Sequence, residues 1–141
     1  MITDSKKVYR PKSGMRNLER SVLSAIHAWQ DESPDTLAQL LGTISLETDP
    51  HLQHPWYAHT DLPLPLQADA NELRIAAKIF RNDLIDIGAS VATIHTIPLV
   101  ESRYNDFLIK TNNKSSVLFM QSMRLVDRIV RGESDLSLIH I

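Results

Sequence analysis

Residues 69–96 read DANELRIAAKIFRNDLIDIGASVATIHT, and this stretch decides the expected fold. Its apolar residues recur at alternating intervals of four and three, which is the pattern of an amphipathic helix. The residues in this pattern are Leu73, Ala77, Phe80, Leu84, Ile87, Val91 and Ile94, and Ile75, Ile79 and Ile85 widen the apolar surface. Asp69 and Glu72 have the spacing of a capping box that opens a helix. We therefore predict a central helix over 69–96, buried on more than one side.

Two features allow this helix to end before residue 96. Gly88 lowers helix stability by about 1 kcal/mol relative to alanine, and it marks either close packing or an early end. The β-branched residues of 91–97 are also compatible with a strand.

Two shorter patterns predict helices before the central one. Apolar residues recur at helical spacing from Met15 to Trp29, and we expect that helix to end near Gln30, because the residue before Pro34 is disfavoured in a helix. A second helix is expected to begin at once, with Ser33 as its N-cap and Pro34 as its first residue, and to end near Gly42.

The C-terminal part has two interpretations. We favour a helix over 98–110, a turn at Asn112 and Asn113, and a helix over 116–131 that is capped by Ser115 and ends at Gly132. The alternative is a β-hairpin over 106–120, because β-prone segments flank the polar turn. It would make the protein α+β.

Residues 45–68 carry Pro50, Pro55, Pro63 and Pro65 and show no periodicity, so they predict a long Pro-rich connection. The expected fold is therefore an all-α, bundle-like single domain of four to five helices over 15–141, preceded by a flexible basic arm over 1–14.

The composition limits the class of protein and the kinds of site that the chain can form. The 141 residues are 43% hydrophobic and 23% charged, which is typical of one core-forming domain. The chain contains no cysteine, so disulfides, thiolate metal sites and cysteine nucleophiles are excluded. No apolar run approaches the length of about 18 residues that a membrane span needs, so we expect no membrane contact and a cytoplasmic location.

Charge is distributed unevenly behind the net value of −2. Residues 1–20 hold six basic and two acidic side chains, and residues 21–73 hold eight acidic side chains and no Lys or Arg. The remainder holds nine basic and seven acidic side chains. Such segregation indicates charge-dependent association with a partner, or with the chain itself.

Seven basic residues are candidates for binding a partner or a nucleic acid. They are Lys6, Lys7, Arg10 and Lys12 in the arm, and Arg124, Arg128 and Arg131, whose spacing puts them on one face of a helix. The favoured interpretation of the arginines is a solvated helix face, because the pI of about 6.3 is low for a dedicated nucleic-acid binder.

A histidine cluster in the Pro-rich connection is the candidate metal site. His51, His54 and His59 are suitable ligands for zinc or another divalent ion. Their spacing does not match the paired histidines of a zinc-binding helix, so surface or interface histidines are favoured and no cofactor is expected. The neighbouring Trp56 and Tyr57 are candidate interface residues.

No phosphate-binding glycine loop and no nucleophile motif occurs in the sequence, so it indicates a non-enzymatic protein. The preferred hypothesis is a small interaction module, an adaptor or regulatory subunit, that docks apolar helix surface and complementary charge onto another protein and onto a second copy of itself. The alternatives are a nucleic-acid-binding regulator and a metal-binding protein.

Overall fold

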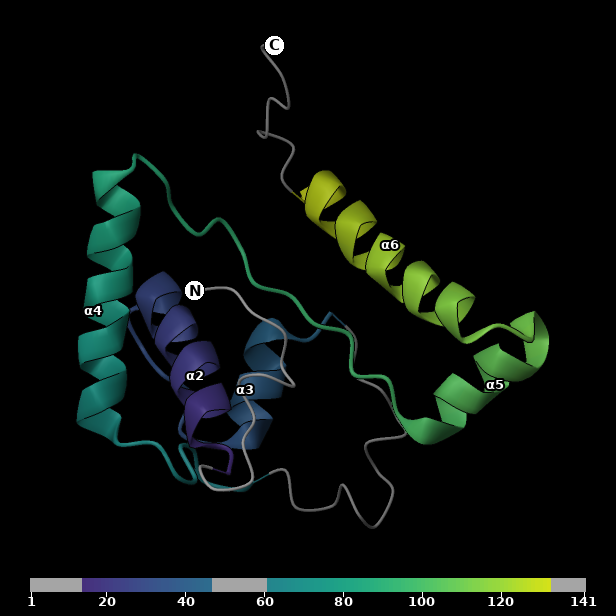
Figure 1. Ribbon diagram of the computed structural model, residues 1–141, viewed down its shortest axis with the longest axis horizontal. Coiled ribbons are helices and arrows are strands. Elements are labelled where there is room, and N and C mark those ends of the chain that lie inside the picture. Colours follow the sequence, from purple (N-terminus) through teal and green to yellow (C-terminus); the bar gives the residue numbers. More distant parts are fainter. Residues whose placement is uncertain (1–13, 47–60, 133–141) are drawn as a thin grey trace. The chain divides into compact units, whose positions relative to one another are not determined.

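The computed structural model describes residues 14–46 and 61–132, and 67% of these residues are helical. They form five helices (Figure 1). Strand pairing within the described ranges is limited to two isolated bridges, between Thr36 and Pro63 and between Ser45 and Thr96. The predicted all-α fold is confirmed. The basic arm expected over 1–14 lies, except for Gly14, outside the described residues.

The chain divides into two compact units. Unit 1 contains α2 (Arg16–Gln30), most of α3 (Leu37–Ile44) and α4 (Ala70–Asp86). Unit 2 contains residues 44–46, α5 (Glu101–Thr111) and α6 (Lys114–Gly132). The single helical domain expected over 15–141 stays a prediction.

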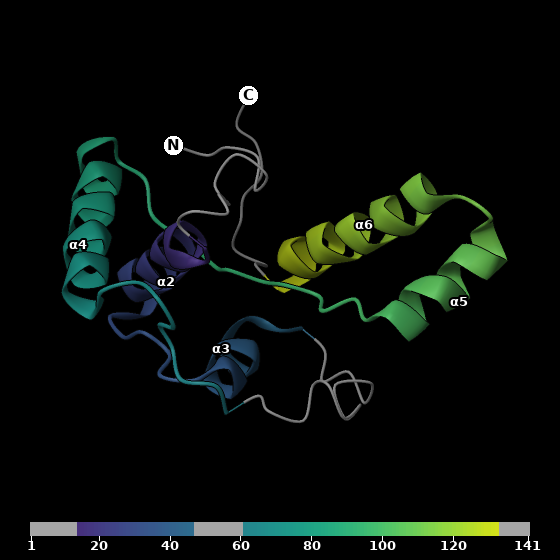
Figure 2. The same ribbon diagram turned by 60° about the horizontal axis from the view of Figure 1, so that its bottom comes forward.

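In unit 1, α2 and α4 lie side by side and run parallel (Figures 1 and 2). Arg16 at the start of α2 donates to both carboxylate oxygens of Glu72 in the first turn of α4, at 2.8 and 2.9 Å. Hydrogen bonding to Glu72 and attraction by its charge raise the pKa of the Arg16 guanidinium. At the other end, Arg81 of α4 donates to the carbonyl of Ala28 at 2.6 and 3.0 Å and pairs with Asp31. Arg81 thus satisfies a carbonyl that the last turn of α2 leaves without an intrahelical partner.

The core of unit 1 is small and includes one charged group. The buried apolar side chains of α2 and α4 are Leu23, Ile26, Leu73 and Ala77. Glu19 is only 7% exposed, and its carboxylate accepts the N–H groups of residues 66, 67 and 68 at 2.6, 2.8 and 2.9 Å. This contact holds the segment that enters α4 against α2, and charge-assisted bonds of this kind are among the stronger ones in proteins.

The beginning of α3 differs from the prediction. The helix begins at Leu37, because the Thr36 hydroxyl accepts the N–H of Gln39 at 3.1 Å and the Gln39 side chain accepts the N–H of Asp35 at 2.7 Å. The expected N-cap, Ser33, instead places its hydroxyl 3.1 Å from Nδ1 of His27. The cap is therefore formed by Thr36 and Gln39, which have the Thr-x-x-Gln spacing of a capping box.

The central helix is shorter and more exposed than predicted. Asp69 caps α4 by accepting the N–H groups of Asn71 and Glu72, as expected, but the helix ends at Asp86. Gly88 has a φ of +70°, and the N–H groups of Gly88 and Ala89 bond to the carbonyls of residues 85 and 84, which is a Schellman ending. The prediction of a helix over 87–96 is wrong, and so is burial on several sides. Three isoleucines of α4 are 55 to 65% exposed, namely Ile75, Ile79 and Ile85.

The strand considered for 91–97 is reduced to the single bridge at Thr96, whose N–H bonds to the carbonyl of Ile44 at 2.8 Å. The remainder of that stretch has no regular secondary structure.

In unit 2, α5 and α6 form a helical hairpin, so the alternative of a β-hairpin over 106–120 is wrong. The turn is at Asn112, which has a φ of +49°, and Asn113 caps α6 by accepting the N–H of Ser115 at 2.9 Å. The expected cap, Ser115, is already inside the helix. The helix expected from Pro98 begins at Glu101 instead, after extended residues that end at Val100.

Substitution of Glu19 tests the central contact of unit 1. Glu19→Gln replaces one accepting oxygen by an amide N–H₂ that faces backbone donors, so we expect a loss of about 3 kcal/mol in the free energy of unfolding. The exposed Glu32 provides the matched control, and Glu32→Gln is expected to leave stability unchanged. Urea denaturation followed by circular dichroism measures both. Equal stability of the two variants would contradict the role assigned to Glu19.

Candidate docking site

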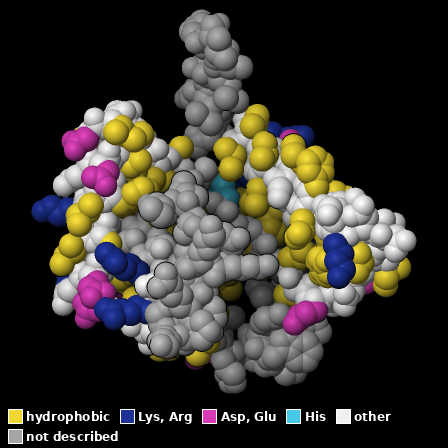
Figure 3. Space-filling model, viewed as in Figure 1, with side chains coloured by type: hydrophobic (Ala, Val, Ile, Leu, Met, Phe, Trp, Pro, Cys, Tyr) yellow, Lys and Arg dark blue, Asp and Glu magenta, His cyan; other side chains and the backbone are white. Residues whose placement is uncertain are grey.

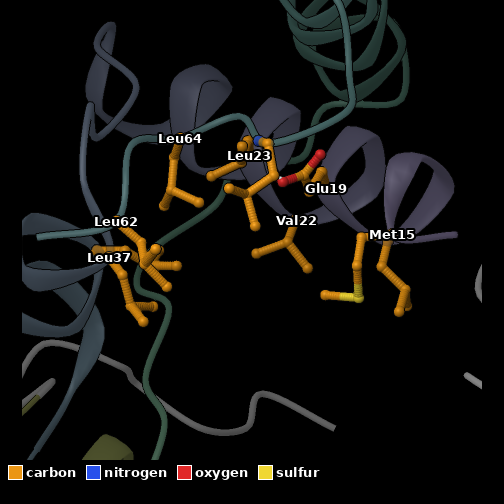
Figure 4. Close-up of a pocket in the computed structure, with 10 residues that line it drawn as sticks. Met15, Glu19, Val22, Leu23, Leu37, Leu62 and Leu64 are labelled. Atoms are coloured by element: carbon orange, nitrogen blue, oxygen red, sulfur yellow. Dashed lines mark hydrogen bonds between the residues drawn. The ribbon is translucent and has the colours of Figure 1, made fainter. Parts of the chain in front are cut away.

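An apolar pocket of about 360 Å³ opens on unit 1. Three elements line it: the face of α2 away from α4, the first turns of α3, and the segment that leads into α4. The apolar lining residues are Met15, Leu18, Val22, Leu23, Leu37, Leu40, Leu62, Leu64 and Leu66. Figure 4 shows side chains from these separate parts of the chain converging on one space.

Backbone pairing brings the lining segments together. The N–H of Leu37 donates to the carbonyl of Leu62 at 2.9 Å, and the N–H of Leu64 donates to the carbonyl of Asp35 at 2.8 Å. The start of α3 is thereby fixed beside the segment 62–66. The side chains of Leu62, Leu64 and Leu66 all line the pocket.

The one charged lining residue is not available for chemistry. Glu19 contributes to the pocket wall, but both of its carboxylate oxygens accept backbone N–H groups of residues 66–68. A general acid or base needs an oxygen that reaches the substrate. The pocket therefore offers apolar contact without a group for proton transfer or metal binding.

Two acidic and two basic residues adjoin the lining residues in the sequence, namely Asp35, Asp61, Arg16 and Arg20. Asp61 directly precedes Leu62, Asp35 lies two residues before Leu37, and both aspartates are exposed. Arg16 is directed to Glu72 of α4, and Arg20 is exposed beside Glu19. With Arg16 paired, two carboxylates and one guanidinium adjoin the lining, and this net negative charge favours a positively charged partner.

The predicted arginine face is present on α6. Residues 124, 128 and 131 fall within one side of the helix and are exposed. Arg124 donates to Gln121 at 2.9 Å, and Arg131 pairs with Asp127 at 2.7 Å. These contacts within the helix fit the interpretation of a solvated face, and nucleic-acid binding by these arginines stays a prediction.

The other predicted site residues lie outside the described ranges. This applies to the arm residues Lys6, Lys7, Arg10 and Lys12, to the histidines His51, His54 and His59, and to Trp56 and Tyr57. Within 14–46 and 61–132, no group of three or more His, Asp or Glu side chains is placed to hold a metal ion. The zinc alternative at the three histidines therefore stays a prediction.

The leucines at 62, 64 and 66 were not predicted as site residues. The prolines and the lack of helical spacing indicated an irregular connection. The signal available in the sequence was the repeated leucine at 62, 64 and 66, separated only by prolines.

Comparisons of the chain with protein-family models, with curated proteins and with solved structures find no match. Among the helices that the structure describes, none has the combination of length and apolar character needed to cross a membrane.

Proposed function

We propose that this protein is a non-enzymatic interaction module, an adaptor or regulatory subunit, that binds a basic amphipathic segment of another protein in the pocket of unit 1. The observation that carries the proposal is the pocket of about 360 Å³ with nine apolar lining residues. An apolar helix face that enters a hydrophobic groove is a common mode of peptide recognition. The module is proposed to act in the cytoplasm.

The size and lining of the pocket support side chains as its occupants. A cavity of about 150 Å³ holds one benzene-sized group, so this pocket has room for two side chains of leucine or phenylalanine size. Sites for small polar ligands place a few polar groups that fix orientation. Here the only charged lining group, Glu19, is already satisfied by backbone N–H groups.

The charge around the pocket supports a basic partner. Asp35 and Asp61 adjoin its lining residues against one exposed arginine, Arg20, since Arg16 is paired with Glu72. Opposite charges at the edge of an interface mainly accelerate association and select partners. A second proposed partner is another copy of this chain.

Two designed peptides of about 14 residues test the pocket, one with leucine on one face and lysine elsewhere, and one with glutamate in place of lysine. We expect the basic peptide to bind at least tenfold more tightly, with an affinity that falls as salt is added, because the charges at the rim are exposed. Fluorescence anisotropy of labelled peptides measures both affinities. Equal binding of the two peptides would contradict the proposed charge preference, and binding of neither would overturn the docking function.

Matched variants locate the binding. Val22 lines the pocket and is 44% exposed, so Val22→Asp places a charge in the site while the helix can still fold. Ile79 is 55% exposed on α4 and does not line the pocket. We expect Val22→Asp to weaken binding of the basic peptide at least tenfold and Ile79→Asp to leave it unchanged. Equal losses in both variants would show that the peptide binds elsewhere.

A further inference from the structure

One face of α6 is apolar and exposed along three turns. It consists of Phe119, Met123, Val126 and Val130, which are 65, 45, 47 and 49% exposed. Their intervals of four, three and four are those of a coiled-coil seam. At 3.6 residues per turn they fall within about 60° of the helix circumference, so they form a single stripe. Figure 3 shows hydrophobic side chains following α6 on the surface.

The stripe is turned away from the interior of its own unit. In the first half of α6 the inner face is marked by Val117, which is fully buried, and by Gln121, which is 7% exposed; further along the helix this side carries the exposed Arg124 and Arg128. The centre of the stripe lies about 170° around the helix from Val117 and Gln121. One helix cannot bury both faces against the same neighbour, so the packing that buries Val117 leaves the stripe for another surface.

We propose that the stripe binds the same stripe of a second copy of this chain, with the two α6 helices antiparallel. This inference rests on the proposed function, in which a second copy of the chain is a partner. It names the surface through which the two copies bind. Phe and Met are enriched at protein interfaces, and the centres of interfaces are depleted in charge. The stripe has this composition, and the adjacent carboxylate of Asp127 is already paired with Arg131 at 2.7 Å.

Charge distribution favours self-association over a charged partner. The arginines of α6 lie about 135° from the centre of the stripe, so two copies meet without bringing these like charges together. A partner chosen by charge would find none within the stripe. The same seam of four apolar residues is present on both copies, which is the requirement for an interface with two-fold symmetry.

Side-chain size favours the antiparallel direction. A two-fold axis between Met123 and Val126 places Phe119 beside Val130 of the second copy, and Met123 beside Val126 of the second copy. Each layer then combines a large and a small side chain, which gives layers of similar volume. A parallel pair would place Phe119 on Phe119 and Val130 on Val130, with unequal layers. The exposed stripe offers less than the area of about 800 Å² per partner of a typical stable interface, so the expected dimer is weak, near micromolar.

Sedimentation equilibrium of the full chain tests the surface. We expect a monomer–dimer equilibrium that Val126→Glu weakens at least tenfold, since the two introduced carboxylates lie near the axis. Ile79→Glu, on the exposed face of α4, is the matched control and leaves the equilibrium unchanged. A dimer insensitive to Val126→Glu would overturn this inference and leave self-association standing. If the wild-type chain stays monomeric up to about 500 μM, both the α6 interface and self-association are overturned, and the proposal of peptide binding by unit 1 is unaffected.

Single-cysteine variants test the direction, because the chain contains no cysteine of its own. A disulfide needs Cα atoms within about 7 Å, whereas residues 119 of two antiparallel copies are about 16 Å apart along the helix. We therefore expect a mixture of Phe119→Cys and Val130→Cys to form a disulfide-linked dimer, and Phe119→Cys alone to form little. Ile79→Cys mixed with Val130→Cys is the control for random collision. Efficient linking of Phe119→Cys with itself would overturn the antiparallel arrangement.

Discussion

Three backbone N–H groups, those of residues 66–68, converge on the buried carboxylate of Glu19, and unit 1 is organised around this contact. It fixes the segment that leads from the Pro-rich connection into α4. Asp69 follows at once and caps α4, so the new helix begins beside the first turns of α2. Because α2 and α4 start at the same end, they run parallel, and Arg16 and Arg81 meet partners at the two ends.

The same contact creates the pocket. With residues 66–68 held on α2, the leucines at 62, 64 and 66 face the side of α2 that α4 does not cover. The carboxylate is then satisfied, so the pocket is apolar despite the glutamate in its wall. The Glu19 carboxylate holds the lining segment in place, and its hydrogen bonds leave no oxygen for catalysis. The pocket is therefore suited to apolar side chains.

Local patterns predicted the helices well where a single chain segment supplies the signal. The bounds expected for 15–30 and 116–131 agree closely with α2 and α6, and Asp69 caps α4 as predicted. The prediction failed where two local signals competed. Apolar spacing continued past Gly88, but the left-handed conformation of that glycine ended the helix. Thr36 with Gln39 capped α3 in place of Ser33 and Pro34, because their side chains satisfy two N–H groups at once.

The helical class, the positions of most helices, the segregation of charge and the absence of cysteine chemistry follow from the amino-acid sequence alone. These depend on spacing and composition within short windows. Which apolar residues are left exposed, and which polar groups are already hydrogen-bonded, depends on contacts between distant parts of the chain. Val117 and the stripe residues of α6 are all apolar in the sequence, and packing within unit 2 buries only Val117. Glu19 is likewise indistinguishable in the sequence from a surface glutamate, because its donors lie 47 to 49 residues further along the chain.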